Sequence, residues 1–269
     1  MIKMSQKFSG LVEGIMKVRK FAWAFMAMFV AVLTVSAINS KEGELIEGID
    51  VAISPLAEGD LLLTDEEVID ELERSFTKPL DGLFLADIDV ARVEAILERH
   101  PLVRDADAYV DTEQLLHVHI VQRQPLLRII SNIGQNYYLD ELGIRMPLSE
   151  QYTARVLVAT GEIMAWSNDY QERKKHQLKD LYDLARLLQA DEFLDALIEQ
   201  IHLDKNGEII LAPKVGDQVI YLGTYDAEET PQRLARLKVF YRKGLPYEGW
   251  QKYKSFDLRY ARQVVCGKR

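Results

Sequence analysis

Apolar and polar residues alternate along most of this chain, but one early stretch shows no alternation at all. This stretch is Phe21–Ile38, eighteen residues without a charge, preceded by Lys17, Arg19 and Lys20. As a helix it would be about 27 Å long, close to the hydrocarbon thickness of a bilayer. A helix in a soluble core usually keeps a polar stripe, and this one would have none. We therefore predict a transmembrane helix, with anchor residues Phe21, Trp23, Phe25, Phe29 and Ile38.

The same stretch could instead be a cleaved signal peptide. Signal peptides have an apolar region of about 7–15 residues and a small-x-small cleavage site. This run is longer, and Ser36, Ala37 and Ile38 match such a site poorly, so an uncleaved anchor is favoured. Residues 1–20 carry five basic side chains against the single acid Glu13. The positive-inside rule then predicts a cytoplasmic N-terminus and export of all that follows the span.

The region after the anchor combines helical and strand periodicities. Thr64 and Glu67 have the spacing of a capping box, in which each side chain binds the backbone of the other residue. Two runs near residue 110 alternate with a period of two, as expected for a hairpin with one buried face. The predicted elements are a strand at 45–53, helices starting after Thr64 and at Asp89, and strands at 103–110 and 116–120. Their order, β-α-α-β-β, predicts a small α+β layer.

The second half of the chain is predicted to be richer in strands, with flanking helices. Asn206-Gly207 lies between two apolar runs and predicts a hairpin, because this pair tolerates positive φ. Thr230 followed by a proline predicts the start of a helix. The predicted elements are strands at 126–130, 135–139, 155–159, 201–203, 208–211, 219–222 and 254–265, and helices at 170–189, 193–198 and from Thr230 to Gly244.

Composition and charge narrow the function classes. Apolar residues make up 48% of the chain, which argues for folded domains. The net charge is −9, and removing the five basic and one acidic residues of 1–20 leaves −13. The exported part of the chain is therefore strongly acidic, which makes it a poor candidate for binding nucleic acid or anionic lipid. The single cysteine, Cys266, allows no intramolecular disulfide, and no histidine lies nearby in sequence to activate it.

No stretch carries a recognisable catalytic motif. His117 and His119 share one face of a predicted strand, as a metal pair can, but the spacing fixes no third ligand. A polar, solvent-facing pair is the simpler interpretation. Asp65, Glu66 and Glu67 cluster at a helix start, where acidic residues are expected in any case. We therefore predict no catalytic residues, no metal site and no cofactor.

Several motifs together resemble the FtsQ/DivIB family of bacterial cell-division proteins. His100–Ile129 has the helix-ending His-Pro, two strands and the Gln-Arg-x-Pro exit of that family's POTRA module. Gln135–Gly143 is similar to the aromatic-Leu-Asp-x-x-Gly stretch that opens its second domain, and Phe256–Tyr260 to its terminal Asp-Leu-Arg-Tyr strand. The resemblance implies a tail at 1–20, a transmembrane helix at 21–38, a POTRA domain at 44–124 and a β domain at 125–269.

The resemblance also implies a function. The family's terminal strand binds an extended segment of FtsB, which travels with FtsL, so the expected partner-binding residues are Phe256, Asp257, Leu258, Arg259 and Tyr260. The chain would be a divisome scaffold without enzymatic activity, located in the inner membrane at the division septum. The residues alone leave open whether this strand is an exposed edge or an internal strand with Phe256, Leu258 and Tyr260 facing the core.

Two other functions remain as alternatives. A membrane-anchored envelope enzyme, such as a cell-wall hydrolase, would need converging carboxylates or a nucleophile–base pair. A POTRA-type transport or secretion chaperone usually carries tandem modules or a transmembrane barrel, whereas this sequence predicts one module and one helix.

Overall fold

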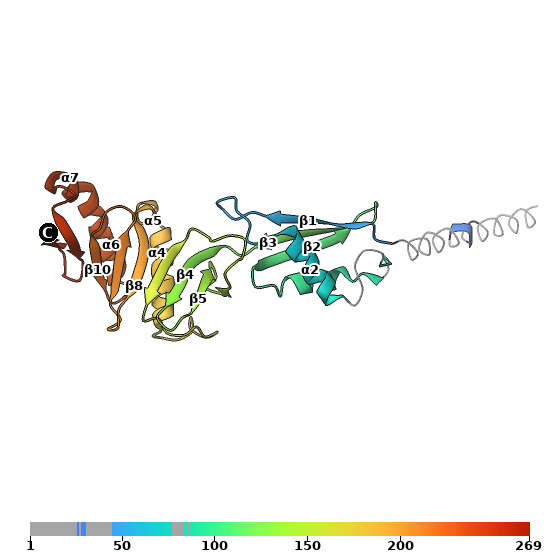
Figure 1. The fold of residues 1–269 in the computed structure, drawn as a ribbon, viewed down its shortest axis with the longest axis horizontal. Helices are drawn as coiled ribbons and strands as arrows, with labels where there is room; N and C mark the ends of the chain where they lie inside the picture. Colours follow the sequence, from blue (N-terminus) through green and yellow to red (C-terminus); the bar gives the residue numbers. More distant parts are fainter. Residues whose placement is uncertain (1–25, 27, 31–44, 77–82, 85–86) are drawn as a thin grey trace, which may run out of the picture. The chain divides into compact units, whose positions relative to one another are not determined.

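The computed structural model describes residues 26, 28–30, 45–76, 83–84 and 87–269 (Figure 1). The chain is divided into two compact units. The first comprises Met1–Ala52, Val68–Ile96 and Asp107–His119, and the second Ile53–Glu67, Leu97–Ala106 and Ile120–Arg269. The expected domain limits, 44–124 and 125–269, stay predictions.

Most of the predicted membrane anchor lies outside the described residues, including Phe21, Trp23, Phe25 and Ile38. Of the anchor residues only Phe29 is described, and its side chain is exposed. Among the residues that the structure describes, no helix is both long enough and apolar enough to cross a bilayer. The span and its orientation therefore stay predictions.

A three-stranded sheet with two helices follows, in the predicted order β-α-α-β-β. The elements are β1 (Gly48–Ser54), α2 (Asp65–Ser75), α3 (Val90–Leu97), β2 (Val103–Val110) and β3 (Leu115–Gln122). The strand order in the sheet is β1-β3-β2, so β3 is central. The capping box forms as predicted: Thr64 N donates to Glu67 Oε2 at 2.9 Å, and Glu67 N to Thr64 Oγ1 at 3.2 Å. The assignment of this region as a POTRA module stays a prediction.

The second half of the chain forms one nine-stranded sheet, in the order β12-β11-β10-β9-β8-β7-β4-β5-β6. The strands are β4 (Pro125–Ser131), β5 (Asn136–Asp140), β6 (Arg145–Met146), β7 (Leu157–Gly161), β8 (Ile198–Leu203), β9 (Ile209–Pro213), β10 (Val219–Gly223), β11 (Tyr253–Asp257) and β12 (Val265–Lys268). The pairs β4–β7, β7–β8 and β10–β11 are parallel, and the other pairs are antiparallel.

Helices α4, α5 and α6 lie on the same side of this sheet (Figure 1). The helical elements are α4 (Gln177–Gln189), α5 (Glu192–Leu197), α6 (Glu229–Val239), the π-helix η2 (Phe240–Gly244) and α7 (Leu245–Glu248). Leucines of α4 and α6 pack with residues of the central strands in one buried core, which includes Leu181, Leu237, Ile201, Leu211 and Phe256. The mixed α+β class is therefore confirmed.

Two predicted helix starts are wrong. The helix expected from Tyr170 begins only at Gln177, with His176 as its N-cap. Tyr170 is instead buried in the core, and its hydroxyl donates to the Gly143 carbonyl at 2.9 Å. Residues 168–175 form turns and bends instead of the first part of a helix. The helical periodicity could not indicate this, because the contact joins residues 27 positions apart in the sequence.

The expected cap of the later helix is also different. Thr230 lies inside α6 and is buried, and its Oγ1 accepts from Asp226 N at 3.0 Å. The helix start is satisfied by Asp226, whose Oδ1 accepts from Glu228 N and Glu229 N, each at 2.9 Å. These two bonds lower the pKa of the Asp226 carboxyl, because they favour its charged form.

Candidate partner-binding edge

The predicted single strand at 254–265 is two strands with different positions in the sheet. The first, β11, lies between β10 and β12 and ends at Asp257. The chain continues one residue along β10, where Leu258 N donates to the Tyr221 carbonyl at 2.9 Å. It then turns through Arg262, which has a φ of 61°, and returns as β12. The edge strand at this end of the sheet is therefore β12, and β6 lies at the other end.

Two of the five predicted contact residues face the core. The side chains of Phe256 and Leu258 are fully buried. Phe256 packs edge-to-face on Phe240 and Tyr241, with ring centroids 5.1 and 5.6 Å apart. Aromatic pairs in this arrangement stabilise a core beyond the area that they bury. Phe256 and Leu258 thus fix the position of β11 from the helix side of the sheet.

Arg259 and Asp257 belong to a charge network at the end of β11. Arg259 Nη2 lies 2.6 Å from Asp257 Oδ2, and its Nη1 lies 2.9 Å from Glu208 Oε2. The guanidinium also lies over the Tyr221 ring, 5.4 Å from its centroid. The hydrogen bond from Arg259 lowers the pKa of Asp257, and both carboxylates raise the pKa of Arg259. Arg259 is therefore already engaged within its own chain, although it remains partly exposed.

The approach of Arg259 to the sheet depends on a glycine. A Cβ added to Gly223 would lie 2.9 Å from Arg259 Cγ and 3.2 Å from Arg233 Nη1. Gly223 also has a φ of 85°, in the left-handed region that side chains rarely adopt. The absence of a side chain at this position lets both arginines lie against the end of β10.

Tyr260 has 51% of its surface exposed, and Arg259 is the other exposed residue of the predicted five. The Tyr260 backbone is held by a side chain of α6. Arg236 Nη2 donates to the carbonyls of Leu258 at 3.1 Å and of Tyr260 at 3.5 Å. The Tyr260 ring is thus presented to solvent from an anchored segment. Tyrosine in such a setting is a frequent interface anchor.

The edge strand β12 itself was not among the predicted sites. It pairs with β11, with Val265 opposite Asp257 and Lys268 opposite Tyr253. Val265 is exposed, whereas Cys266 packs against the core. Burial raises the pKa of the Cys266 thiol. The β-branched pair Val264-Val265 after a polar turn was the sequence signal that could have separated β12 from β11.

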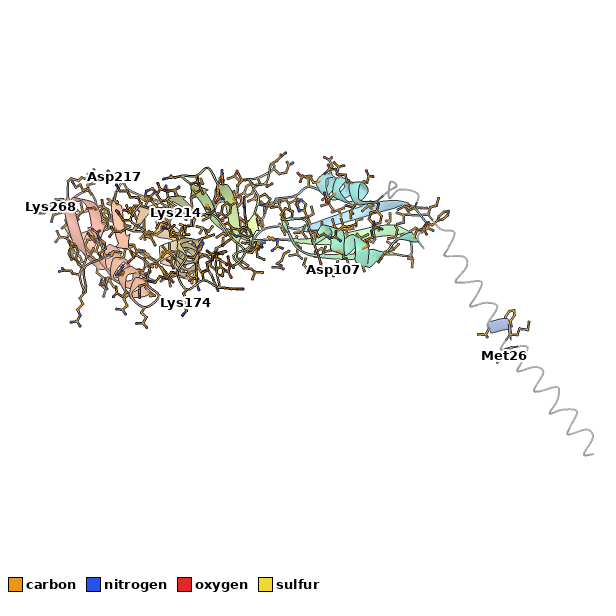
Figure 2. The ribbon with its side chains drawn as sticks, turned by 90° about the horizontal axis from the view of Figure 1, so that it is seen from below. Met26, Asp107, Lys174, Lys214, Asp217 and Lys268 are labelled. Atoms are coloured by element: carbon orange, nitrogen blue, oxygen red, sulfur yellow. The ribbon has the colours of Figure 1, made fainter. Side chains whose placement is uncertain are left out.

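Further exposed aromatic residues and basic residues surround this edge. Tyr247 and Trp250, in and just after α7, are both exposed. Lys268 and Asp217 lie at the same end of the second unit (Figure 2), and Asp217 forms an ion pair with Arg269. The last 28 residues contain eight basic and two acidic side chains, although the chain as a whole has a net charge of −9. This end therefore forms a basic region in an acidic protein.

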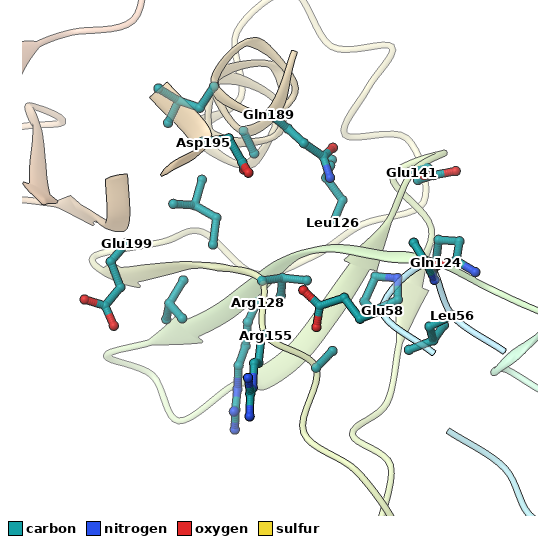
Figure 3. A pocket seen from close by; sticks show the side chains of 18 of the residues that line it. Leu56, Glu58, Gln124, Leu126, Arg128, Glu141, Arg155, Gln189, Asp195 and Glu199 are labelled. Atoms are coloured by element: carbon teal, nitrogen blue, oxygen red, sulfur yellow. Dashed lines mark hydrogen bonds between the residues drawn. The ribbon is translucent and has the colours of Figure 1, made fainter. Parts of the chain in front are cut away.

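A separate cavity of about 580 Å³ opens beside the segment that leads into β7. Figure 3 shows Arg128 and Arg155 side by side on its wall, with Asp195 and Glu199 from α5 and β8 elsewhere around it. Arg128 Nε donates to Asn136 Oδ1 at 3.1 Å. Within the described ranges, no three His, Cys, Asp or Glu side chains are placed to hold a metal ion. His117 and His119 lie on β3, and Asp65, Glu66 and Glu67 in the first turn of α2.

Among the described residues, the large sheet ends in a strand with a single neighbouring strand, beside exposed aromatic and basic side chains. This arrangement is typical of a protein-binding module. The family model described as "FtsQ/DivIB, C-terminal related" matches residues 124–267, more than half of the chain. The chain belongs to this family of cell-division proteins, which act through protein–protein interactions of the divisome at the division site. No curated protein matches the chain.

Proposed function

We propose that this chain is a bitopic divisome scaffold that binds FtsB, together with FtsL, by strand addition to β12. The observation that carries the proposal is the position of β12 at the end of the nine-stranded sheet. Among the described strands it has one neighbour, β11, so half of its backbone N–H and C=O groups point away from the sheet. A partner segment in extended conformation can pair with these groups.

The side chains around β12 would select the partner. Tyr260 and Val265 offer exposed apolar contact, and Lys268 offers positive charge, whereas Arg269 is paired with Asp217. A segment that alternates apolar and acidic residues would complement this surface, because opposite charges steer association and fix register. Tyr260 is the contact residue that we favour among the predicted five.

The other four residues would act mainly by shaping this edge. Phe256 and Leu258 hold β11 in the core, while Asp257 and Arg259 fix the turn that leads to β12. Arg259 can meet a partner carboxylate as well, because its side chain is 39% exposed and its guanidinium has five N–H donors.

The rest of the chain would place this site. The predicted helix at 21–38 would hold the N-terminus in the cytoplasm and the folded units outside it. The POTRA-like region would recruit further divisome components. Septal peptidoglycan synthesis would thereby be linked to the cytoplasmic division ring, with no chemistry performed by this chain.

Binding measurements on single-residue variants test the proposal. Titration of the purified chain with the extracytoplasmic parts of FtsB and FtsL should show Tyr260→Ala weakening the complex about tenfold or more, because truncating an interface anchor costs roughly 1–2 kcal/mol or more. Lys268→Glu should also weaken the complex, and the loss should be largest at low salt, where the charge repulsion is least screened. The matched control is Ile133→Ala, an exposed apolar side chain in the turn between β4 and β5, far from β12 in the strand order. Unchanged affinity in the folded Tyr260 and Lys268 variants would exclude β12 as the binding edge.

A cellular experiment separates the scaffold from the alternative functions. Depletion of the chain should give filaments with unseparated septa, and the Ile133→Ala chain should restore division where Tyr260→Ala does not. Hydrolysis of purified peptidoglycan by the wild-type chain would instead favour the envelope enzyme.

A further inference from the structure

The exposed face of the small sheet carries a histidine between two carboxylates. His117, on the central strand β3, places Nδ1 2.9 Å from Asp50 Oδ2 on the edge strand β1. Its Nε2 lies 2.8 Å from Asp111 Oδ2, at the end of β2. One imidazole ring therefore connects all three strands of the sheet on its solvent-facing side.

This geometry fixes the number of bound protons. A neutral imidazole has one N–H, and an ionised carboxylate has none. Two hydrogen bonds of 2.8 and 2.9 Å need two hydrogens, so a neutral ring between two ionised carboxylates leaves one close pair of acceptors without a proton. The cluster must hold one additional proton, on the ring or on a carboxyl group, for both contacts to be hydrogen bonds.

The surroundings favour the ring as the proton's position. The hydrogen bond to Asp111 and then that to Asp50 raise the pKa of His117. The hydrogen bond from His117 and then that from Leu115 N lower the pKa of Asp111, so this carboxyl stays ionised. The Tyr109 ring stacks on the imidazole, with centroids 4.9 Å apart and planes at 22°, and limits its rotation.

Few other charged groups approach the ring from the neighbouring elements. On β2, Asp107 lies on the exposed face with Tyr109, and on β3 the next exposed position is His119. The turn before β3 contributes Glu113, whose backbone N–H binds Asp111 Oδ1 at 2.8 Å. On α3, Glu94 is occupied with Ala108 N at 2.9 Å. The charges that act directly on His117 are those of Asp111 and Asp50.

We propose that Asp50, His117 and Asp111 form a proton-binding clasp that fastens the edge strand β1 to the small sheet, closed while the cluster holds its additional proton and opened when that proton is lost. The proposal does not depend on FtsB binding. If the folded units lie outside the cytoplasm, as proposed above, the clasp would respond to the pH of the surrounding medium.

The direction of the pH dependence follows from the two pKa shifts. His117 has a raised pKa in the folded chain, so its contribution is complete below its unfolded value and is lost as the pH rises through the folded value. Asp111 has a lowered pKa, so its contribution is lost only as the pH falls through that lower folded value. The clasp is therefore closed at pH values between the folded pKa of Asp111 and the folded pKa of His117. It opens when the pH rises through the folded pKa of His117.

Histidine NMR titration of the full-length chain tests the clasp at the ring itself. The His117 resonance, assigned with His117→Gln, should show a lower titration midpoint in Asp111→Asn and in Asp50→Asn than in the wild-type chain. Asp107→Asn is the matched control, because this carboxylate lies on the same exposed face of the sheet, whereas the two ring nitrogens are bound by Asp50 and Asp111. Equal midpoints in wild type and Asp111→Asn would overturn the proposal.

Hydrogen exchange provides the second measurement. After correction for the intrinsic rate, the protection of β1 amides in the wild-type chain should fall as the pH rises through the folded pKa of His117. In His117→Gln, which cannot titrate, protection should show no such fall. If that variant does not fold, Asp50→Asn with the same expectation replaces it. Protection of β1 that is independent of pH in the wild-type chain would refute the clasp, whatever the outcome of the FtsB measurements.

Discussion

The buried ion pair between Arg123 and Asp140 allows a sharp test of how the large sheet is held at its β4–β5 end. Asp140 Oδ2 lies 3.0 Å from Arg123 Nη1, and the Asp140 side chain is only 4% exposed. Its Oδ1 accepts from Leu142 N at 3.0 Å and from Ile144 N at 2.7 Å, which closes the turn after β5. One carboxylate thus neutralises a partly buried arginine and binds two backbone N–H groups.

Asp140→Ala should lower the free energy of unfolding by about 3–5 kcal/mol, because removing one partner leaves a buried charge uncompensated. Asp140→Asn should cost about 1–3 kcal/mol, since the amide oxygen can still accept from the turn. At roughly 2–4 °C per kcal/mol for a domain of this size, the alanine variant should melt about 10 °C lower. Scanning calorimetry measures both shifts.

The matched control is Asp70→Ala on α2. Asp70 pairs with Arg74 at 3.3 Å, but both side chains are well exposed, so its loss should cost at most about 0.5 kcal/mol. Equal melting temperatures for the Asp140 and Asp70 variants would show that the Arg123–Asp140 pair contributes nothing beyond a surface ion pair. If Asp140→Asn lowered the melting temperature as much as Asp140→Ala, the stabilisation would come entirely from the carboxylate charge and not from the hydrogen bonds that close the turn.

Three further results are expected. Gly223→Ala should destabilise the β10 end by about 1 kcal/mol or more, because of the positive φ and the approach to Arg259; an unchanged urea midpoint would contradict this. Thr64→Ala should cost about 1 kcal/mol through loss of the capping box, measurable by urea denaturation. The hydrogen bond from Lys238 lowers the pKa of Asp191, and the two side chains lie 2.5 Å apart. Their contact should therefore stabilise the fold at pH values above the unfolded pKa of Asp191, and this effect should be lost as the pH falls through its folded pKa. Asp191→Asn should flatten that part of the stability–pH curve, and an unaltered curve would speak against the pair.

Local sequence patterns determined much of the secondary structure. The period-two alternation at 103–110 predicted β2 with its observed limits, and the Thr64–Glu67 spacing predicted a capping box that forms. Both features depend on residues within a few positions of one another, where side-chain direction is fixed by backbone geometry. The order of motifs similarly indicated the family, which the match over 124–267 confirms.

Tertiary structure alone decided which elements became neighbours. Alternation shows which face of a strand is buried but not which strand lies beside it, so the parallel β4–β7–β8 and β10–β11 pairs were not predictable from periodicity. The same limit explains the wrong single strand at 254–265: its apolar positions fit one long strand, but β10 and the core hold only the part up to Leu258.

The two most informative sites were likewise set by long-range contacts. The sequence placed Tyr260 on a terminal strand, whereas the turn through Arg262 leaves that residue exposed and makes β12 the edge. The sequence also placed His117 on a polar face, but only the pairing of β3 with its neighbours brings Asp50 and Asp111 to its two nitrogens. Residues 67 positions apart meet there because a sheet joins distant segments through backbone hydrogen bonds, which no local pattern encodes.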